Sequence, residues 1–125
     1  MKVIILGESN SIFNQFISEI RCEVIQKDPM RFRKNLQRLG EIFAYEISKV
    51  MDYETTDIKT PLGVAPVSTL VQHPVLATIL RAGLPVHQGM LNYFDQAGNA
   101  FVSAYRKHHK DNTFEIKVEY MSSPD

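Results

Sequence analysis

The stretch PVLATILRAGL, Pro74–Leu84, decides the fold that we predict for this chain. Val75 to Leu80 is a nearly continuous apolar run, which is typical of a parallel β-strand that is covered on both faces. The run ends at Arg81-Ala82-Gly83, and a helix-like segment from Leu84 to Phe94 follows, with Pro85 in its first turn. The sequence therefore predicts a buried strand, then an arginine-bearing loop, then a helix.

A second predicted strand completes this unit. Ala100 to Tyr105 is another apolar run, so a strand, a helix and a strand follow one another within about 30 residues. This order indicates a βαβ unit over residues 74–106 and an α/β fold class. We expect parallel central strands flanked by helices.

Arg81 and Arg106 each follow one of the two predicted parallel strands. Because both strands run in the same direction, we expect the two arginines to emerge at one edge of the sheet, where open parallel sheets bind ligands. A guanidinium group can fork onto phosphate oxygens, and the small Ala82 and Gly83 would let backbone N–H groups approach a ligand closely. The pattern alone also fits a surface arginine beside a turn glycine, and Arg106 as part of a solvated basic turn.

Helical and strand patterns flank the βαβ unit. The long helix predicted for residues 28–52 has Asp28 as its N-cap, Pro29 in its first turn and apolar residues at intervals of three or four. The other predicted elements are a strand at residues 2–6, a helix at 11–21, a hairpin at 57–60 and 64–67, and a half-exposed strand at 114–118. We interpret residues 1–125 as a single domain.

Composition indicates an ordinary globular domain with no strong electrostatic field. Of its 125 residues, 44% are hydrophobic and 22% charged, and the 14 basic and 14 acidic residues cancel. Balanced charge does not favour nucleic acid or an anionic membrane as a partner, so an anion would bind in a local pocket. Cys22 is the only cysteine, which excludes an internal disulfide and fits a cytoplasmic protein. We expect neither a signal peptide nor a membrane-spanning segment in these residues.

An ordered set of short motifs resembles the uracil phosphoribosyltransferase family. In chain order the motifs are Phe32-Arg33, Ala44-Tyr45-Glu46, Thr60-Pro61-Leu62-Gly63, Ile79-Leu80-Arg81-Ala82-Gly83-Leu84 and Ala104-Tyr105-Arg106. They cover nearly the whole chain but only the N-terminal part of the longer family sequence. The TPLG motif alone is weak, whereas ILRAGL after a buried strand is quite specific, and the order of the whole set is strong.

The resemblance implies a three-layer type I phosphoribosyltransferase fold and a specific activity. Such enzymes displace pyrophosphate from phosphoribosyl pyrophosphate (PRPP) with uracil and so make UMP in pyrimidine salvage. By the resemblance, Arg81 and Arg106 match arginines that contact the pyrophosphate of PRPP, and Ala82 and Gly83 match the loop beneath it. Mg²⁺ would be bound together with PRPP.

The resemblance also implies partners beyond the substrates. Residues 106–121, which we call the β-arm, match a segment that helps to form the family's homodimer. GTP regulates some relatives and is a candidate effector here. The turn with His108-His109 differs from the more acidic loop that is common in bacterial members.

Two segments of the family have no match in these 125 residues. One is the acidic, Ala-Thr-Gly-containing loop that cradles the 5′-phosphate of PRPP, and the other is the later segment that reads the edge of uracil. We therefore predict that the 125 residues by themselves have no catalytic turnover. The sequence does not distinguish a naturally short protein from a part of a longer one.

Two alternative functions belong to other classes of protein. A shortened phosphoribosyltransferase could serve as a non-catalytic oligomerisation module. The block Gly7-Glu8-Ser9-Asn10-Ser11 loosely resembles the nucleophile block of a GDSL-like hydrolase that would use Ser9. That enzyme also needs an Asp-x-x-His pair, which the chain lacks, and the serines suit helix capping better. We expect none of the four histidines to ligate a metal.

Overall fold

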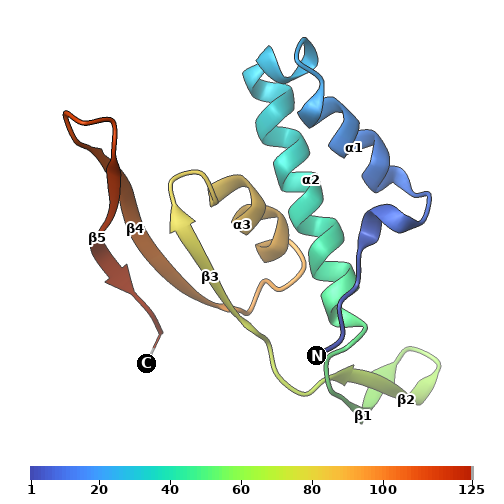
Figure 1. Ribbon diagram of the computed structural model, residues 1–125. Coiled ribbons are helices and arrows are strands. Elements are labelled where there is room, and N and C mark those ends of the chain that lie inside the picture. The colour runs from blue at the N-terminus through green and yellow to red at the C-terminus, as the bar shows by residue number, and fades with distance from the viewer. Residues whose placement is uncertain (125) are drawn as a thin grey trace.

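The structure is a computed structural model that describes residues 1–124, and Figure 1 shows its layout. The helical elements are η1 (Leu6–Glu8), α1 (Ile12–Arg21), η2 (Ile25–Lys27), α2 (Pro29–Ser48) and α3 (Leu84–Leu91). The strands are β1 (Tyr53–Thr60), β2 (Gly63–Leu70), β3 (Val75–Leu80), β4 (Gly98–His108) and β5 (Phe114–Ser122). The predicted α/β class is confirmed.

The predicted βαβ unit is present. β3 and β4 pair in parallel, with Val75 opposite Gly98 and Leu80 opposite Ser103, and α3 connects them. β5 pairs antiparallel with β4 and completes a three-stranded sheet in the order β3-β4-β5. α3 lies between this sheet and α2 in Figure 1, so the layers are the sheet, α3 and α2.

The two predicted helices before the sheet begin at their predicted caps. The Asp28 carboxylate accepts hydrogen bonds from two backbone N–H groups of the first turn of α2, each at 3.1 Å. The hydroxyl of Ser11 accepts a hydrogen bond from the first turn of α1 in the same way. α2 ends at Ser48, slightly before the predicted end. None of the described helices is both long and apolar enough to cross a membrane.

α3 packs closely on α2 because each helix has a glycine where the two cross. A Cβ atom on Gly89 would clash with the backbone carbonyl oxygen of Gln37, and one on Gly40 would clash with that of Val86. Gly40 is unfavourable inside a helix by about 1 kcal/mol relative to alanine. The close approach of the two backbones explains why glycine stands there.

A small core joins α2 to the sheet. It consists of Ala44, Leu76, Phe94 and Ala97, with Met51, Leu70, Met90 and Leu91 packed against it. Leu76 and Phe94 are 6% and 2% exposed. Burying a side chain of this size contributes about 1.5–3 kcal/mol, so this contact fixes β3 against the helices.

The described residues cover β3 on one face only, which corrects the prediction of a strand covered on both. Leu76 is buried beneath α3, whereas Val75 and Ile79, on the opposite face, are 58% and 63% exposed. The reason is that, within residues 1–124, the helices that pack toward β3 (α3, with α2 behind it) lie on the face of Leu76.

Several element boundaries also differ from the predictions. Residues 2–5 form no strand, because no other described strand pairs with them. β4 continues past Tyr105 to His108, because β5 pairs with it along this length. α3 ends at Leu91, before the predicted Phe94. The hairpin around Pro61-Leu62-Gly63 is confirmed, with longer strands than predicted.

Candidate functional site

The loop after β3 is shaped by its immediate turn into α3. The backbone N–H of Gly83 donates a hydrogen bond to the carbonyl oxygen of Ile79 at 3.1 Å, so the loop folds back onto the end of the strand. A Cβ atom on Gly83 would clash with the hydroxyl of Thr78, and the position therefore needs a residue without a Cβ atom. This turn leaves Arg81 and Ala82 exposed at the carboxyl end of β3.

An open pocket of about 780 Å³ lies at this end of the sheet, and we call it the β3-end pocket. Its lining residues are Leu80, Arg81 and Ala82 around the loop, Ser103, Ala104 and Tyr105 of β4, and Glu119 of β5. Two predicted site residues, Arg81 and Ala82, thus line one pocket, and Gly83 follows them as the N-cap residue of α3. The carboxyl ends of parallel strands are the usual place for ligands in open α/β sheets.

Arg106 lies farther along β4 and does not line the β3-end pocket. It pairs with Ile116 of β5, and its guanidinium carbon lies 4.3 Å from the centroid of the Phe114 ring, a cation–π contact inside the β-arm. The parallel pairing places Arg81 and Arg106 toward the same end of the sheet, although Arg106 lies within β4 and not after it. The structure does not bring both side chains into one pocket, and a shared role in pyrophosphate binding stays a prediction.

Glu119 is a pocket residue that the sequence did not predict. Ser103 pairs with Tyr120 and Ala104 pairs with Val118, so Glu119 has no partner and forms a β-bulge. A bulge changes the direction of a side chain, and bulges are common beside functional sites. The alternating sequence of this strand predicts that Glu119 is exposed to solvent. It does not predict the bulge, because a bulge depends on the pairing of two strands.

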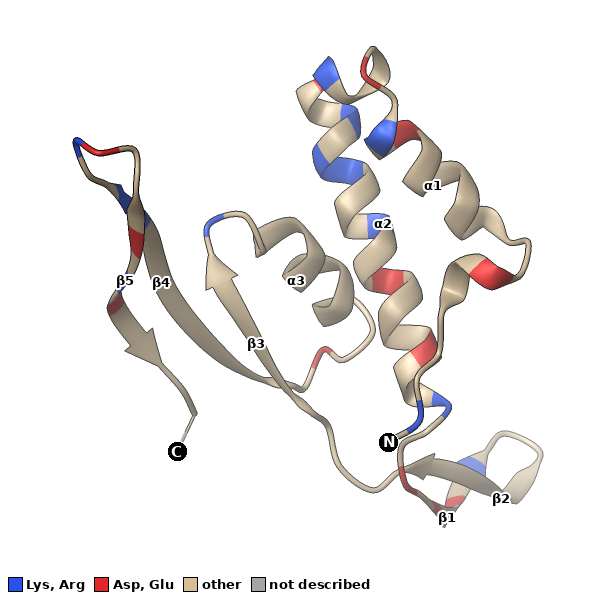
Figure 2. Cartoon of the chain, in the orientation of Figure 1, with Lys and Arg blue, Asp and Glu red and all other residues tan. Residues whose placement is uncertain are grey.

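The charges around the β3-end pocket have both signs. Figure 2 shows basic residues in the loop after β3 and along the β-arm, and acidic residues on β5. In the pocket lining itself, Arg81 is the one cation and Glu119 the one carboxylate among the described residues. The described lining of the pocket therefore combines one positive and one negative side chain.

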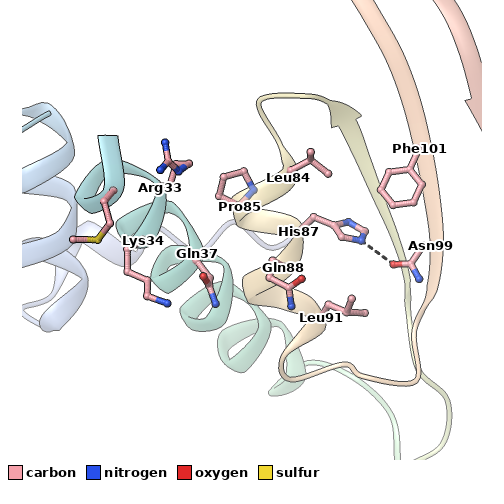
Figure 3. Close-up of a pocket in the computed structure, with 11 residues that line it drawn as sticks. Arg33, Lys34, Gln37, Leu84, Pro85, His87, Gln88, Leu91, Asn99 and Phe101 are labelled. Carbon is pink, nitrogen blue, oxygen red and sulfur yellow. Dashed lines mark hydrogen bonds between the residues drawn. The ribbon is translucent and has the colours of Figure 1, made fainter. Parts of the chain in front are cut away.

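A second pocket, of about 700 Å³, lies between α2 and α3 and reaches β4 (Figure 3). Arg33 and Lys34 of α2 line it, and its described lining contains no acidic residue. On its far side the ring nitrogen Nε2 of His87 lies 2.8 Å from Oδ1 of Asn99, and the His87 and Phe101 ring centroids are 5.0 Å apart. This pocket, which we call the α2–α3 pocket, combines positive charge, amide groups and an aromatic ring.

The structure gives no support to a hydrolase site at Ser9. Within the described residues, the cavity beside Ser9 has no histidine in its lining. Ser9 follows η1, and it is Ser11 that caps α1. Among residues 1–124, no group of three His, Cys, Asp or Glu side chains could hold a metal ion.

Comparison with known proteins gives a consistent result. The family model described as uracil phosphoribosyltransferase matches residues 8–124. A uracil phosphoribosyltransferase of Porphyromonas gingivalis is 54% identical over 125 residues, which is all of this chain and 58% of the relative. One from Thermococcus gammatolerans is 38% identical over 87% of this chain and 50% of the relative. The matched residues thus span 58% and 50% of the lengths of these two relatives.

A solved structure also resembles this fold. The AQ2163 protein from Aquifex aeolicus superposes with a TM-score of 0.76 at 25% sequence identity. The superposition covers 93% of this chain and 54% of that protein. The arrangement of helices and strands described above therefore recurs in a longer protein.

Proposed function

We infer a function from one premise: the chain belongs to the uracil phosphoribosyltransferase family. The observation that carries this premise is the match of the family model over residues 8–124. Because the chain spans 58% of the Porphyromonas gingivalis relative, the activity of the whole protein is our proposal. It transfers the phosphoribosyl group of PRPP to uracil, which gives UMP and pyrophosphate, and it serves pyrimidine salvage in the cytoplasm.

The β3-end pocket is our candidate for the pyrophosphate half of the PRPP site. Arg81 lines this pocket, and its guanidinium group can donate two parallel hydrogen bonds to phosphate oxygens. Negative charge grows on pyrophosphate as its bond to ribose breaks, and a fixed cation stabilises that charge. We propose that Ala82 and Gly83 form the loop beneath the anion. We also propose that Arg106 contacts the same anion from the side of the β-arm.

The reaction needs orientation and charge more than a reactive side chain. The ribosyl centre becomes cationic as pyrophosphate departs, so uracil must be held in line with the breaking bond. Mg²⁺ bound together with PRPP would neutralise part of the negative charge of the leaving group. The described residues fit a metal carried by the substrate, because they offer one pocket carboxylate and no group of three ligands.

Calorimetric titration of PRPP in the presence of Mg²⁺ tests the β3-end pocket. We expect Arg81→Ala to weaken PRPP binding by roughly ten- to a hundredfold, the effect of losing hydrogen bonds to a charged group. The control is Arg21→Ala, because Arg21 lies at the end of α1, outside this pocket. Equal binding by the unsubstituted chain and Arg81→Ala would contradict the proposed site.

We propose that the 125 residues alone bind PRPP weakly and do not catalyse the formation of UMP. The reason is that the loop for the 5′-phosphate and the segment for uracil have no match in this sequence. An assay of UMP formation on the purified 125-residue chain checks this, and normal turnover would contradict it.

The β-arm is our candidate for the contact between two copies of the chain. Phe114, Ile116, Val118 and Tyr120 of β5 are between 51% and 70% exposed, so the arm presents apolar surface. Such surface is typical of a protein–protein contact. It also supports the alternative of a non-catalytic oligomerisation module. A dimer mass together with PRPP binding supports the enzyme, whereas a dimer that binds no PRPP supports the module.

We propose the α2–α3 pocket as the site of the GTP effector. Arg33 and Lys34 supply two cations for a triphosphate, and Phe101 supplies an aromatic surface for a base. Titration of GTP into the unsubstituted chain and into Arg33→Ala tests the assignment. Equal GTP binding by both proteins would contradict it.

A further inference from the structure

His87 of α3 is a buried side chain whose two ring nitrogens have different surroundings. The residue is 8% exposed, and its Nε2 lies 2.8 Å from Oδ1 of Asn99 on β4. Nδ2 of Asn99 donates a hydrogen bond to the carbonyl oxygen of Ala97 at 3.4 Å, which sets the orientation of the amide. Because an amide oxygen can only accept a hydrogen bond, Nε2 of His87 carries the proton.

The other ring nitrogen of His87, Nδ1, keeps a lone pair that can accept a hydrogen bond. Within residues 1–124, no protein group forms a hydrogen bond with this nitrogen. Nor is it sealed in the interior, because the one fully buried side-chain nitrogen or oxygen without a partner in this part of the chain is Nδ1 of His73. His87 therefore presents an unused acceptor to a cavity.

The α2–α3 pocket is the charged cavity that His87 lines. Figure 3 shows its ring reaching from α3 toward Asn99 and Phe101 of β4. The ring also borders a smaller cavity of about 240 Å³ against β3, whose described lining contains no lysine, arginine or acidic residue. In the α2–α3 pocket, Arg33 and Lys34 supply positive charge, and neither forms an ion pair with a described residue.

These groups define a ligand with two chemically different ends. Arg33 and Lys34 attract phosphate oxygens from the side of α2, whereas His87 on the far side needs an N–H or O–H donor. A largely buried acceptor discriminates against a ligand without a donor, because the acceptor then stays unpaired. A nucleotide whose base carries N–H groups has both ends. Guanine, with its ring N1–H and its amino group, is such a base.

We infer that His87 determines which bases the α2–α3 pocket accepts. Its Nδ1 accepts a hydrogen bond from an N–H group of the base, and Asn99 is a positioning residue that keeps the ring proton on Nε2. This inference rests on the proposed function, because it takes the α2–α3 pocket as the effector site. It adds the chemical property by which the base is selected and the two residues that select it.

The test compares the binding of two nucleotides by calorimetry. One is GTP, and the other is purine riboside 5′-triphosphate, whose base has no N–H group. Both carry the same ribose and phosphates, so Arg33 and Lys34 contribute equally to the two affinities. We expect GTP to bind roughly tenfold more tightly to the unsubstituted chain, the cost of leaving a buried acceptor unpaired. His87→Phe, which removes the acceptor and keeps an aromatic ring, should bind both nucleotides equally.

The matched control is His108→Phe, which makes the same chemical change at the exposed end of β4, outside the pocket lining. It should keep the preference for GTP. Equal binding of both nucleotides by the unsubstituted chain, or an unchanged preference in His87→Phe, would overturn the role of His87. The effector site itself would stand if Arg33→Ala still weakens GTP binding. Absence of any nucleotide binding by the unsubstituted chain would overturn both.

A second variant and a spectroscopic measurement test the role of Asn99. In Asn99→Asp, a carboxylate beside Nε2 favours a ring that is protonated on both nitrogens, so Nδ1 becomes a donor. This variant should lose the preference for GTP, even though the added negative charge weakens the binding of both nucleotides. Nitrogen NMR of the imidazole ring locates the proton. We expect it on Nε2 in the unsubstituted chain and on both nitrogens in Asn99→Asp. A proton on Nδ1 of the unsubstituted chain would overturn the inference.

Discussion

Gly89 determines how closely α3 can lie on α2. We expect Gly89→Ala to lower the free energy of unfolding by roughly 1–3 kcal/mol, the usual cost of overpacking. The new methyl group would meet the carbonyl oxygen of Gln37 and lie near the backbone nitrogen of Glu41, and a backbone cannot move aside as a flexible side chain can. The gain in helix propensity, about 1 kcal/mol, does not offset this clash. Urea unfolding of both proteins measures the difference.

Gly7→Ala is the control for this substitution. A Cβ atom at Gly7 would meet nothing within 4 Å, so the same chemical change should leave the midpoint of unfolding nearly unchanged. A Gly89→Ala protein as stable as the unsubstituted chain would show that α3 can shift on α2.

At the level of residues, the candidate site residues that are neighbours in the sequence were predictable. Arg81, Ala82 and Gly83 are consecutive, so a strand followed by a helix was enough to place them at one end of the sheet. Glu119 was not predictable, because its place depends on a shift in the pairing of β4 and β5. The contact of Arg106 with Phe114 depends on the same pairing.

At the level of elements, Glu19 joins α1 to α2. Nδ2 of the fully buried Asn35 donates a hydrogen bond to Oε2 of Glu19 at 2.7 Å, and Nη1 of Arg31 lies 3.4 Å from the same oxygen. The hydrogen bond from Asn35 is the main cause that lowers the pKa of Glu19 below its ordinary value of 4.5. The carboxylate form therefore stabilises the contact between the two helices.

This contact should weaken in acid. A group whose pKa is lowered by folding stabilises the protein above the pKa of the unfolded chain, and that stabilisation disappears as the pH falls through the lowered value. We expect Glu19→Gln to unfold with a smaller dependence on pH below 4.5 than the unsubstituted chain. Urea unfolding at neutral and acidic pH measures it.

Glu23→Gln serves as the comparison for Glu19→Gln, because Glu23 is exposed in the segment after α1. This variant should keep the pH dependence of the unsubstituted chain. If Glu19→Gln kept it as well, the hydrogen bond from Asn35 would not be the source of the acid sensitivity.

The elements and the starts of the helices followed from local patterns, whereas the limits of the strands did not. Asp28 with Pro29 fixed the start of α2, because capping is decided within one turn of helix. The extension of β4 to His108 needs a partner strand, and the failure of residues 2–5 to form a strand reflects the lack of one among the described strands. Strand limits are set by pairing between distant segments, which a single sequence does not display.

At the level of the whole molecule, the sequence predicted the α/β class and the parallel strand pair better than the cover of the sheet. The apolar run Val75 to Leu80 correctly indicated a parallel strand. It also indicated cover on both faces, whereas the described helices lie on the face of Leu76 alone. An apolar sequence shows that a strand can be buried on both faces. Whether both faces are buried depends on which other elements pack on them.

The uncovered face carries a row of apolar side chains across the three strands. Ile79 of β3 lies beside Val102 of β4, which lies beside Met121 of β5, and Ile79 and Met121 are 63% and 71% exposed. Contiguous apolar surface of this kind binds hydrophobic dyes and promotes association of a protein in solution. The chain as a whole should therefore bind the dye ANS in its folded state.

Replacing Ile79 with lysine should reduce that binding. The side chain is largely exposed, so Ile79→Lys should change the free energy of unfolding by less than about 1 kcal/mol while it interrupts the apolar row. Leu62→Lys is the matched control, because Leu62 is fully exposed in the turn between β1 and β2, away from this face. ANS fluorescence of the folded proteins should fall for Ile79→Lys and stay unchanged for Leu62→Lys. Equal fluorescence of all three proteins would show that the dye binds elsewhere and that this face is not the main apolar surface of the molecule.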